Sequence, residues 1–137
     1  WKDGGAWLND KPIHVSHTPD LSEAIVGTGF PYHDPDKRNV LAEMFQEVLL
    51  ASRGIHRLGS AALDLAYVAS GKLDAFYETT LNAWDIAAGV ILVREAGGMV
   101  TDFNNNGDFI PRKELIASNS SLHEDLGHIV RKHMLEV

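Results

Sequence analysis

The stretch LNAWDIAAGVILVREAGG, residues 81–98, places one carboxylate, Asp85, at the head of a run that is almost entirely apolar and small. The apolar run predicts a helix over Asp85–Ala96 that ends at Gly97-Gly98. In the simplest interpretation Asp85 is the N-cap of this helix, because an aspartate there accepts hydrogen bonds from free backbone N–H groups. Such a cap stabilises a helix by about 1 kcal/mol.

The first turn of that helix is unusually slim, since residues 87–89 are Ala, Ala and Gly. A ligand can therefore come close to the backbone N–H groups, and a helix N-terminus attracts anions such as phosphate. Asp85 would repel a phosphate bound there unless a cation lay between the two. An aspartate and a phosphate at one helix start are thus coherent only with a divalent metal, such as Mg²⁺ held by oxygen ligands.

Two other segments could border the same ligand site at the start of this helix. Glu78 lies seven residues before Asp85, at the end of a strand expected at Lys72–Tyr77, where a solvated acid is the simpler interpretation. The tripeptide Gly59, Ser60, Ala61 opens another slim, apolar helix, and its N–H groups and hydroxyl could hold a small polar ligand. An ordinary N-cap is the simpler interpretation of Ser60.

Residues 102–108, DFNNNGD, match four positions of a calcium-binding loop. The twelfth position of such a loop must be a bidentate Glu, and here it is Lys113. We therefore expect a β-turn rather than a calcium site. The sequence also has no Gly-x-Ser-x-Gly elbow, no Walker loop and no GxGxxG motif.

Other ionisable residues are expected to be structural or solvated. His123, His128 and His133 are spaced by five residues, so they do not share one face of a helix, and we expect solvated side chains rather than metal ligands. Asp64 lies among apolar neighbours and needs a partner, for which Arg57 or a backbone amide is plausible.

Hydrophobic spacing predicts strands alternating with helices. Strands are expected at Ala6–Leu8, Pro12–Val15, Ala24–Thr28, Ile55–Leu58, Lys72–Tyr77, Met99–Asp102 and Leu115–Ala117. Helices are expected at Val40–Ser52, Ser60–Ser70 and Asp85–Ala96, with a C-terminal helix after a cap at Ser118–Ser121. The first two strands flank Asn9-Asp10 and predict a hairpin. The alternation predicts an α/β fold with a mixed sheet covered by helices.

The composition limits the classes of protein. A chain of 137 residues suggests one domain, and with no Cys it has neither disulfides nor Cys-ligated zinc. A formal charge of −7 with no basic stripe argues against nucleic-acid binding, and no apolar run approaches a membrane span of about 20 residues. No signal peptide is visible, so we expect a cytoplasmic protein. The chain begins without Met, which suggests a piece of a longer protein.

Several segments, taken in order, carry a more specific signal. They are RLGSAALDLAYVASGKLDAFYE, WDIAAGVILVREAGGMVTD, GGAWLNDKPIHVS and IVGTGFPY. Together they resemble the C-terminal half of the inositol monophosphatase family, especially its bacterial members, and WD-x-A-A-G…EAGG is similar to the second signature of that family. The resemblance spans nearly the whole chain. It implies the C-terminal half of a layered αβαβα sugar-phosphatase fold.

The resemblance implies roles for particular residues. It makes Asp85 a ligand of a catalytic Mg²⁺ that also contacts a substrate hydroxyl. It makes Gly59, Ser60 and Ala61 the helix start that contacts the inositol ring, and Glu78 the acid that binds a ring hydroxyl. The stretch Gly29–Tyr32 is expected near the substrate.

The departures from the family are equally informative. The first signature of the family, DPxDGT, and the upstream metal-binding Glu are absent. The segment HDPDKRN at 33–39 does not replace this signature, because it lacks the Gly-Thr pair. Residues 1–137 are therefore expected to be the C-terminal domain alone, with the N-terminal metal-binding half supplied by the rest of the same protein. The isolated piece is expected to be inactive.

The complete protein is expected to be a Mg²⁺-dependent, lithium-sensitive phosphatase of inositol monophosphate or a similar sugar or polyol phosphate, and a homodimer. Two alternatives stay open. One is a relative in the superfamily that acts on 3′-phosphonucleotides or fructose 1,6-bisphosphate. The other is a non-catalytic dimerising or interaction module.

Overall fold

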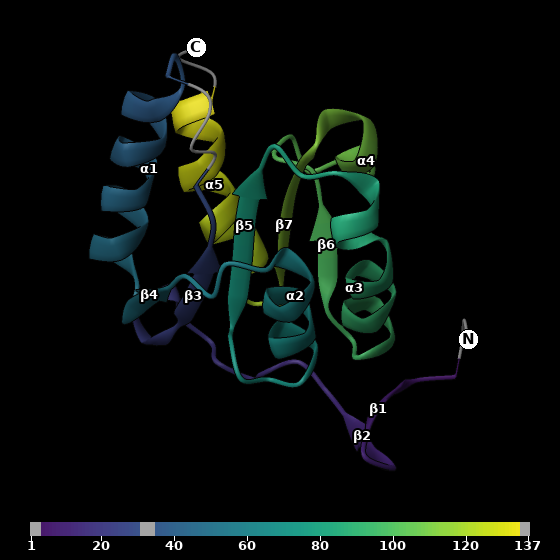
Figure 1. Cartoon of the computed structure of the whole chain (residues 1–137). Coiled ribbons are helices and arrows are strands. Elements are labelled where there is room, and N and C mark those ends of the chain that lie inside the picture. Colours follow the sequence, from purple (N-terminus) through teal and green to yellow (C-terminus); the bar gives the residue numbers. More distant parts are fainter. Residues whose placement is uncertain (1–3, 31–34, 135–137) are drawn as a thin grey trace.

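The described residues form one central sheet that is covered by helices. The computed structural model describes residues 4–30 and 35–134 and is shown in Figure 1. Its five-stranded sheet has the order β4-β3-β5-β7-β6. The strands are β3 (Ile25–Thr28), β4 (Gly54–His56), β5 (Ala75–Thr79), β6 (Met99–Thr101) and β7 (Glu114–Ser118). β3 runs parallel to β4 and β5, whereas β7 is antiparallel to β5 and β6, which makes the sheet mixed as expected.

Alternate residues of the sheet face two separate cores. Phe76 and Leu115 belong to one core, and Tyr77 and Ile116 belong to the other, as the period of two in a strand requires. The first core is covered by α2 (Ala61–Ala69) and α3 (Ala83–Glu95), and the second by α1 (Arg38–Ala51) and α5 (His123–Met134). Figure 1 shows these two pairs of helices on either side of the sheet.

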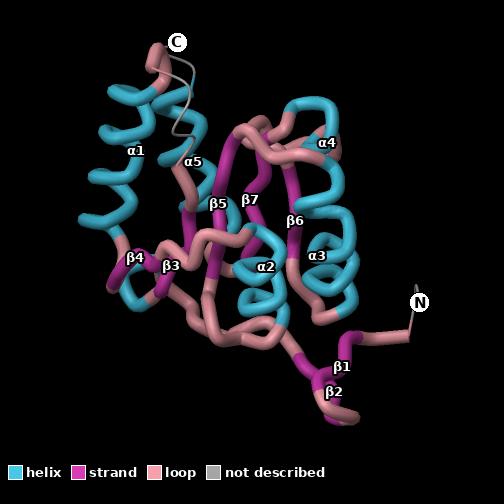
Figure 2. The backbone as a smooth tube through the Cα atoms, viewed as in Figure 1, coloured by secondary structure: helices cyan, strands magenta, loops and turns pink. Residues whose placement is uncertain are grey.

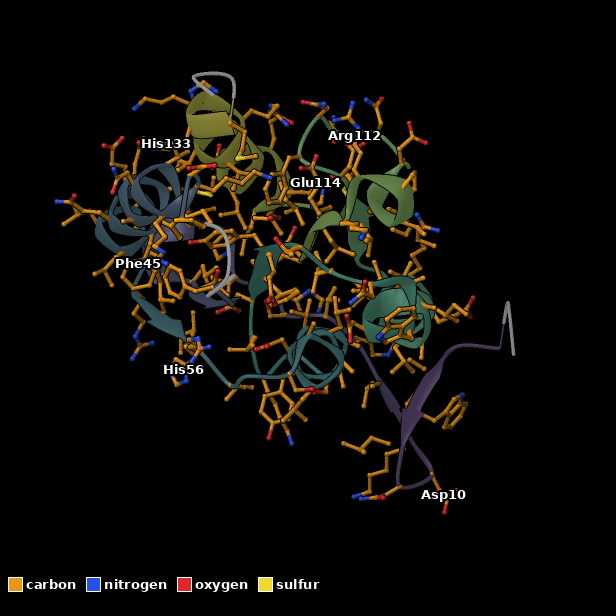
Figure 3. The ribbon with its side chains drawn as sticks, turned by 45° about the horizontal axis from the view of Figure 1, so that its top comes forward. Asp10, Phe45, His56, Arg112, Glu114 and His133 are labelled. Carbon is orange, nitrogen blue, oxygen red and sulfur yellow. The ribbon has the colours of Figure 1, made fainter. Side chains whose placement is uncertain are left out.

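A small hairpin projects from this body, as Figure 2 shows. Its strands are β1 (Ala6–Leu8) and β2 (Lys11–Ile13), so the predicted hairpin is confirmed. The two turn residues, Asn9 and Asp10, have φ of 50° and 62°. Asn and Asp tolerate this left-handed region better than other side chains, and two such residues in succession match the twist of a tight hairpin. Asp10 lies at the tip, away from the sheet, in Figure 3.

Two short elements could not be predicted from hydrophobic spacing. One is a 3-10 helix at Leu21–Glu23. The other is α4 (Phe109–Arg112), a single turn that ends at Lys113 with φ of 58°. A helix of four residues is too short to show a 3.6-residue period, which is why the sequence predicts no helix there.

Strand β5 begins three residues later than expected. The N–H groups of Lys72 and Leu73 both donate to the Tyr67 carbonyl, so these residues complete the C-terminal turn of α2 instead of entering the sheet. Asp74 then accepts hydrogen bonds from the Ile25 N–H and the Thr18 hydroxyl. The strand pairs with β7 as far as Thr79, so Glu78 lies inside it rather than beyond its end.

The other boundaries move by a few residues. Helix α1 begins at Arg38, so the end of the polar segment expected at 33–39 is helical, and its first two residues, like Pro31 and Tyr32, lie outside the described residues. Before helix α5, where a cap is expected at Ser118–Ser121, the Asn119 side chain accepts a hydrogen bond from the Leu122 N–H. Among the described residues, no helix has the length and apolarity needed to cross a bilayer.

Candidate active site

The candidate site lies at the edge of the sheet where three parallel strands end. Because β3, β4 and β5 point the same way, the segments that follow them meet at one edge. These segments carry Gly29 after β3, residues 57–60 after β4, and Glu78 near the end of β5. The helices α2 and α3 begin at the same edge, since each follows one of these strands. Ligands of open α/β sheets bind at such an edge.

The start of α2 is held by Ser60. Its hydroxyl accepts a hydrogen bond from the Leu63 N–H at 3.3 Å, so the ordinary N-cap interpretation is confirmed. Gly59 has φ of 83°, in the left-handed region that favours glycine. A Cβ there would meet no atom within 4 Å, so backbone conformation rather than space requires the glycine. Ser60 and Ala61 are left bordering an open pocket.

Asp85 is the third residue of α3 rather than its N-cap, so that prediction was wrong. The N-cap is Asn82, and the Asn82 N–H donates to Asp85 Oδ2 at 2.9 Å. Asn caps helices as well as Asp does, and an acid three residues later completes a capping box, which moves the helix start back by one turn. The carboxylate is thereby fixed in orientation while it still borders the pocket.

Folding raises the pKa of Glu78. Its pKa is raised to about 7, mainly by burial and also by nearby Asp64 and Asp85, while Arg57 opposes the shift. The expectation of a merely solvated acid is therefore wrong. A Cβ on Gly29 would overlap the Glu78 carboxyl, so the glycine makes the space that this side chain occupies.

The residues singled out from the sequence converge on one pocket. Its volume is about 350 Å³, and its wall includes all five of the predicted substrate and metal residues. These are Gly59, Ser60, Ala61, Glu78 and Asp85. Trp84 stands at the same wall with 81% of its surface exposed.

A second pocket of about 220 Å³ adjoins the first, since both include Gly59, Ser60, Ala61 and Glu78. Asp64 lines this second pocket, although its own surface is only 1% exposed. The expected hydrogen-bond partner is missing for one of its oxygens, because Oδ1 has none within the described part of the chain. Burial raises the pKa of Asp64 to about 6.

The 102–108 segment is a structural turn. Asp102 is fully buried, and its Oδ1 accepts hydrogen bonds from the N–H groups of Asn104 and Asn106 at 2.9 and 2.8 Å. Arg112 lies 3.3 Å from the other oxygen and 3.8 Å from the Glu114 carboxylate, and Figure 3 shows Arg112 and Glu114 close together. The Asp102 carboxylate is thus occupied by its own loop and by a guanidinium, as the turn interpretation expects.

Two of the three helix α5 histidines are buried, so the expectation that they are solvated was wrong for them. His123 contacts the hydroxyls of Ser118 and Thr101 at 2.8 and 2.9 Å. His133 contacts Glu47 of α1 at 2.6 Å, and His128 alone is exposed. The apolar face of α5 packs on the sheet and on α1, and these rings lie at its margins with polar partners.

Comparisons with known proteins agree with this architecture. A model of the inositol monophosphatase family matches residues 1–135. The inositol-1-monophosphatase of Mesorhizobium japonicum is 42% identical over 132 residues, which are 96% of this chain and 49% of the relative. The Nus factor SuhB of Pseudomonas aeruginosa is 41% identical over 95% of this chain and 49% of its own length. The chain therefore spans about half the length of the curated relatives it matches.

Solved structures of relatives have the same fold. The extragenic suppressor protein suhB of Bartonella henselae superposes with a TM-score of 0.91 at 38% identity, covering 96% of this chain and 51% of that one. The inositol monophosphatase of Anabaena superposes with a TM-score of 0.87 at 38% identity, covering 95% of this chain and 52% of that one. The expected α/β fold with a mixed, helix-covered sheet is confirmed.

Proposed function

Because the chain belongs to the inositol monophosphatase family, we propose that the protein carrying it hydrolyses a phosphate monoester of a polyol or sugar, with inositol monophosphate as the leading substrate. The observation that supports this most directly is the convergence of Gly59, Ser60, Ala61, Glu78 and Asp85 on one pocket at the sheet edge. The relative from Mesorhizobium japonicum is named for the same reaction.

Mg²⁺ is the proposed metal, and Asp85 fits it as one oxygen ligand. Its carboxylate is oriented by the Asn82 N–H and borders the pocket. Within residues 4–30 and 35–134, no group of three or more His, Asp or Glu side chains could hold a metal ion. We propose that the remaining ligands come from the rest of the same protein, since the first metal-binding signature of the family is absent from this sequence. Bound Mg²⁺ would supply charge stabilisation for the phosphoryl oxygens and an activated water.

The residues of this chain act mainly on the alcohol. Glu78, partly ionised near neutral pH, accepts a hydrogen bond from a substrate hydroxyl. The backbone at Gly59–Ala61 and the exposed start of α2 contact the ring. Asp85 holds a second hydroxyl beside the reacting centre. The small side chains along this edge let the ring approach the backbone closely. This contact holds the substrate in a fixed orientation for the reaction.

The test is Asp85→Asn in the protein that carries this chain. Asparagine keeps the size of the side chain and can still accept from the Asn82 N–H, so the helix start persists. We expect hydrolysis of inositol 1-phosphate to fall by about 100-fold or more, and its Mg²⁺ requirement to weaken, because a metal ligand contributes several kcal/mol. Asp10→Asn, at the hairpin tip, is the control with the same charge change.

Two outcomes would contradict the proposal. Full activity and an unchanged Mg²⁺ requirement in the Asp85 variant would remove its role as a ligand. Absence of hydrolysis in the parent protein with Mg²⁺ present would favour the alternative of a non-catalytic interaction module, in line with the relatives named Nus factor SuhB. Inhibition by lithium and a homodimer in solution are further parts of the proposal. The 137-residue piece alone is expected to have negligible activity.

A further inference from the structure

The loop between β6 and β7 carries an Asn-Gly pair on its surface. Of the seven asparagines in the sequence, Asn106 alone is followed by glycine. Both residues are exposed, and a Cβ on Gly107 would meet no atom within 4 Å. The φ of Gly107 lies outside the left-handed region, so alanine could replace it there without that strain. The pair is therefore open to water and free of steric constraint.

An asparagine side chain can react with the backbone nitrogen of the residue that follows it. The nitrogen of Gly107 attacks Asn106 Cγ, a new N–C bond closes a succinimide ring, and Nδ2 leaves as ammonia with the proton of the Gly107 N–H. Water then opens the ring at either of its carbonyls. The products are aspartate and isoaspartate, in which the main chain passes through the former side chain. Glycine hinders the attack least, because it has no Cβ beside the nitrogen.

The hydrogen bonds of this loop leave the reacting groups free. Asp102 holds the loop, since its Oδ1 accepts from the Asn106 N–H and its own N–H donates to the Asn106 carbonyl, both at 2.8 Å. Within residues 4–30 and 35–134, no hydrogen bond uses the Asn106 side chain or the Gly107 N–H. The donor on the Asn106 carbonyl polarises the peptide group to which the Gly107 N–H belongs, which makes that N–H a better acid.

The other asparagines lack this combination. Asn39 lies in helix α1, Asn82 is the N-cap of α3, and Asn119 is buried. The remaining three are exposed but are followed by a residue with a side chain: Asn9, Asn104 and Asn105. Asn9, in the turn of the hairpin, therefore serves as an internal comparison.

Reaction at this position would remove an anchor of the loop. The N–H and the carbonyl of Asn106 both bond to Asp102, which is fully buried. Isoaspartate adds one carbon atom to the main chain between that N–H and that carbonyl, so the two bonds cannot both keep their geometry. Either product also adds a negative charge to a segment that already contains Asp102 and Asp108.

We propose that Asn106 is a site of spontaneous deamidation in the folded protein, and that its isoaspartate product loosens the β6–β7 loop by breaking the pairing with Asp102. The modification consumes only water and releases ammonia, so it is independent of the proposed phosphatase reaction. Its extent rises with the age of each molecule, because no enzyme is required.

The test follows residue 106 by peptide mapping and mass spectrometry in the protein that carries this chain, incubated at mildly alkaline pH. The parent peptide should gain the mass difference between water and ammonia and separate into two forms of equal mass. Gly107→Ala is the matched variant, because its methyl group meets no atom in the folded state but hinders the attacking nitrogen. Its rate should be at least about tenfold lower, which corresponds to a barrier about 1.4 kcal/mol higher.

A synthetic peptide of residues 101–110 shows what the fold contributes. The folded protein should react within about tenfold of the rate of this peptide, since neither reacting group must first break a hydrogen bond. Stronger protection in the folded protein would overturn the proposal. Equal rates in the parent and in Gly107→Ala, or a conversion of Asn9 as fast as that of Asn106, would overturn it too.

Thermal unfolding tests the effect on the loop. Parent protein in which residue 106 has been converted should melt about 2–4 °C below fresh parent, the shift expected for about one lost hydrogen bond. Gly107→Ala incubated in the same way should melt as it does when fresh. Asn106→Asp adds the charge without lengthening the main chain, so its Tm should lie above that of the converted parent. An unchanged Tm after conversion would refute the loosening of the loop.

Discussion

Replacing Asp64 by Asn should make the stability of the protein depend less on pH between pH 4 and pH 8. The folded state raises the pKa of Asp64 from 3.8 to about 6, and burial is the cause. A carboxyl whose pKa is raised by folding stabilises the folded state fully below its unfolded pKa. That stability is lost as the pH rises through the folded pKa.

The magnitude follows from the two pKa values. A change from 3.8 to about 6 corresponds to about 3 kcal/mol, because each unit of pKa is 1.36 kcal/mol. The parent protein should therefore lose up to about 3 kcal/mol between pH 4 and pH 8 through this group alone. Asparagine does not titrate, so the stability of the variant relative to the parent should rise by that amount over the same range.

Urea unfolding of parent and variant at several pH values measures this difference. Burying the amide of Asn adds a cost of its own, but that cost is independent of pH and shifts the whole difference curve without changing its slope. Glu78 titrates in both proteins, but Asp64 helps to raise its pKa, so the pKa of Glu78 should fall in the variant and add to the same slope. A difference that stays flat from pH 4 to pH 8 would refute the raised pKa of Asp64.

Three other substitutions test the packing and the site. Gly89→Ala would place a Cβ 2.5 Å from Leu65 Cδ1 and force α2 and α3 apart, so thermal unfolding should show a loss of roughly 1–3 kcal/mol; an unchanged Tm would contradict this close approach. Asp102→Ala removes the acceptor that organises its loop and should cost about 1–3 kcal/mol in urea unfolding with kcat unaltered; a fall in kcat at full stability would give that loop another role. Gly29→Ala should displace the Glu78 carboxyl and raise the KM for inositol 1-phosphate about tenfold; an unchanged KM would argue against Glu78 as a binding residue.

The long periodic elements could be predicted from the sequence because their burial is regular. The helix expected at Val40–Ser52 is found at Arg38–Ala51, and its buried residues Leu41, Met44 and Val48 follow the predicted spacing. The hairpin follows from two residues, Asn9 and Asp10, that favour its turn.

Boundaries set by hydrogen bonds between elements could not be predicted in the same way. Strand β5 starts late because the Tyr67 carbonyl accepts from Lys72 and Leu73, a contact with no periodic signature. The position of Asp85 in its helix was predicted wrongly for a related reason. Two residues, Asn82 and Asp85, both have the chemistry of a helix cap, and a choice between them needs the backbone.

Part of the site could be predicted from the sequence. Family resemblance singled out Ser60, Glu78 and Asp85, and the parallel strands bring their segments to one edge. Asp64 was expected to be a satisfied structural acid, because no local pattern shows that its oxygen lies unpaired over another strand. The signal that could have revealed it is Gly27 and Gly29 at a spacing of two, since glycine inside a strand often marks the close approach of another group.

Gly27 and Gly29 also limit how this protein could acquire new specificity, because a Cβ on Gly27 would lie 3.0 Å from Asp64 Oδ1 and a Cβ on Gly29 would overlap the Glu78 carboxyl. A strand face made of backbone can only lose space by substitution, because every other residue adds atoms where the two carboxyl groups now lie. Variation that widens or recharges the 220 Å³ pocket must therefore arise at its other lining residues, among them Arg57, Asp64 and Glu78. A library built for altered substrates should hold Gly27 and Gly29 constant and randomise those three positions.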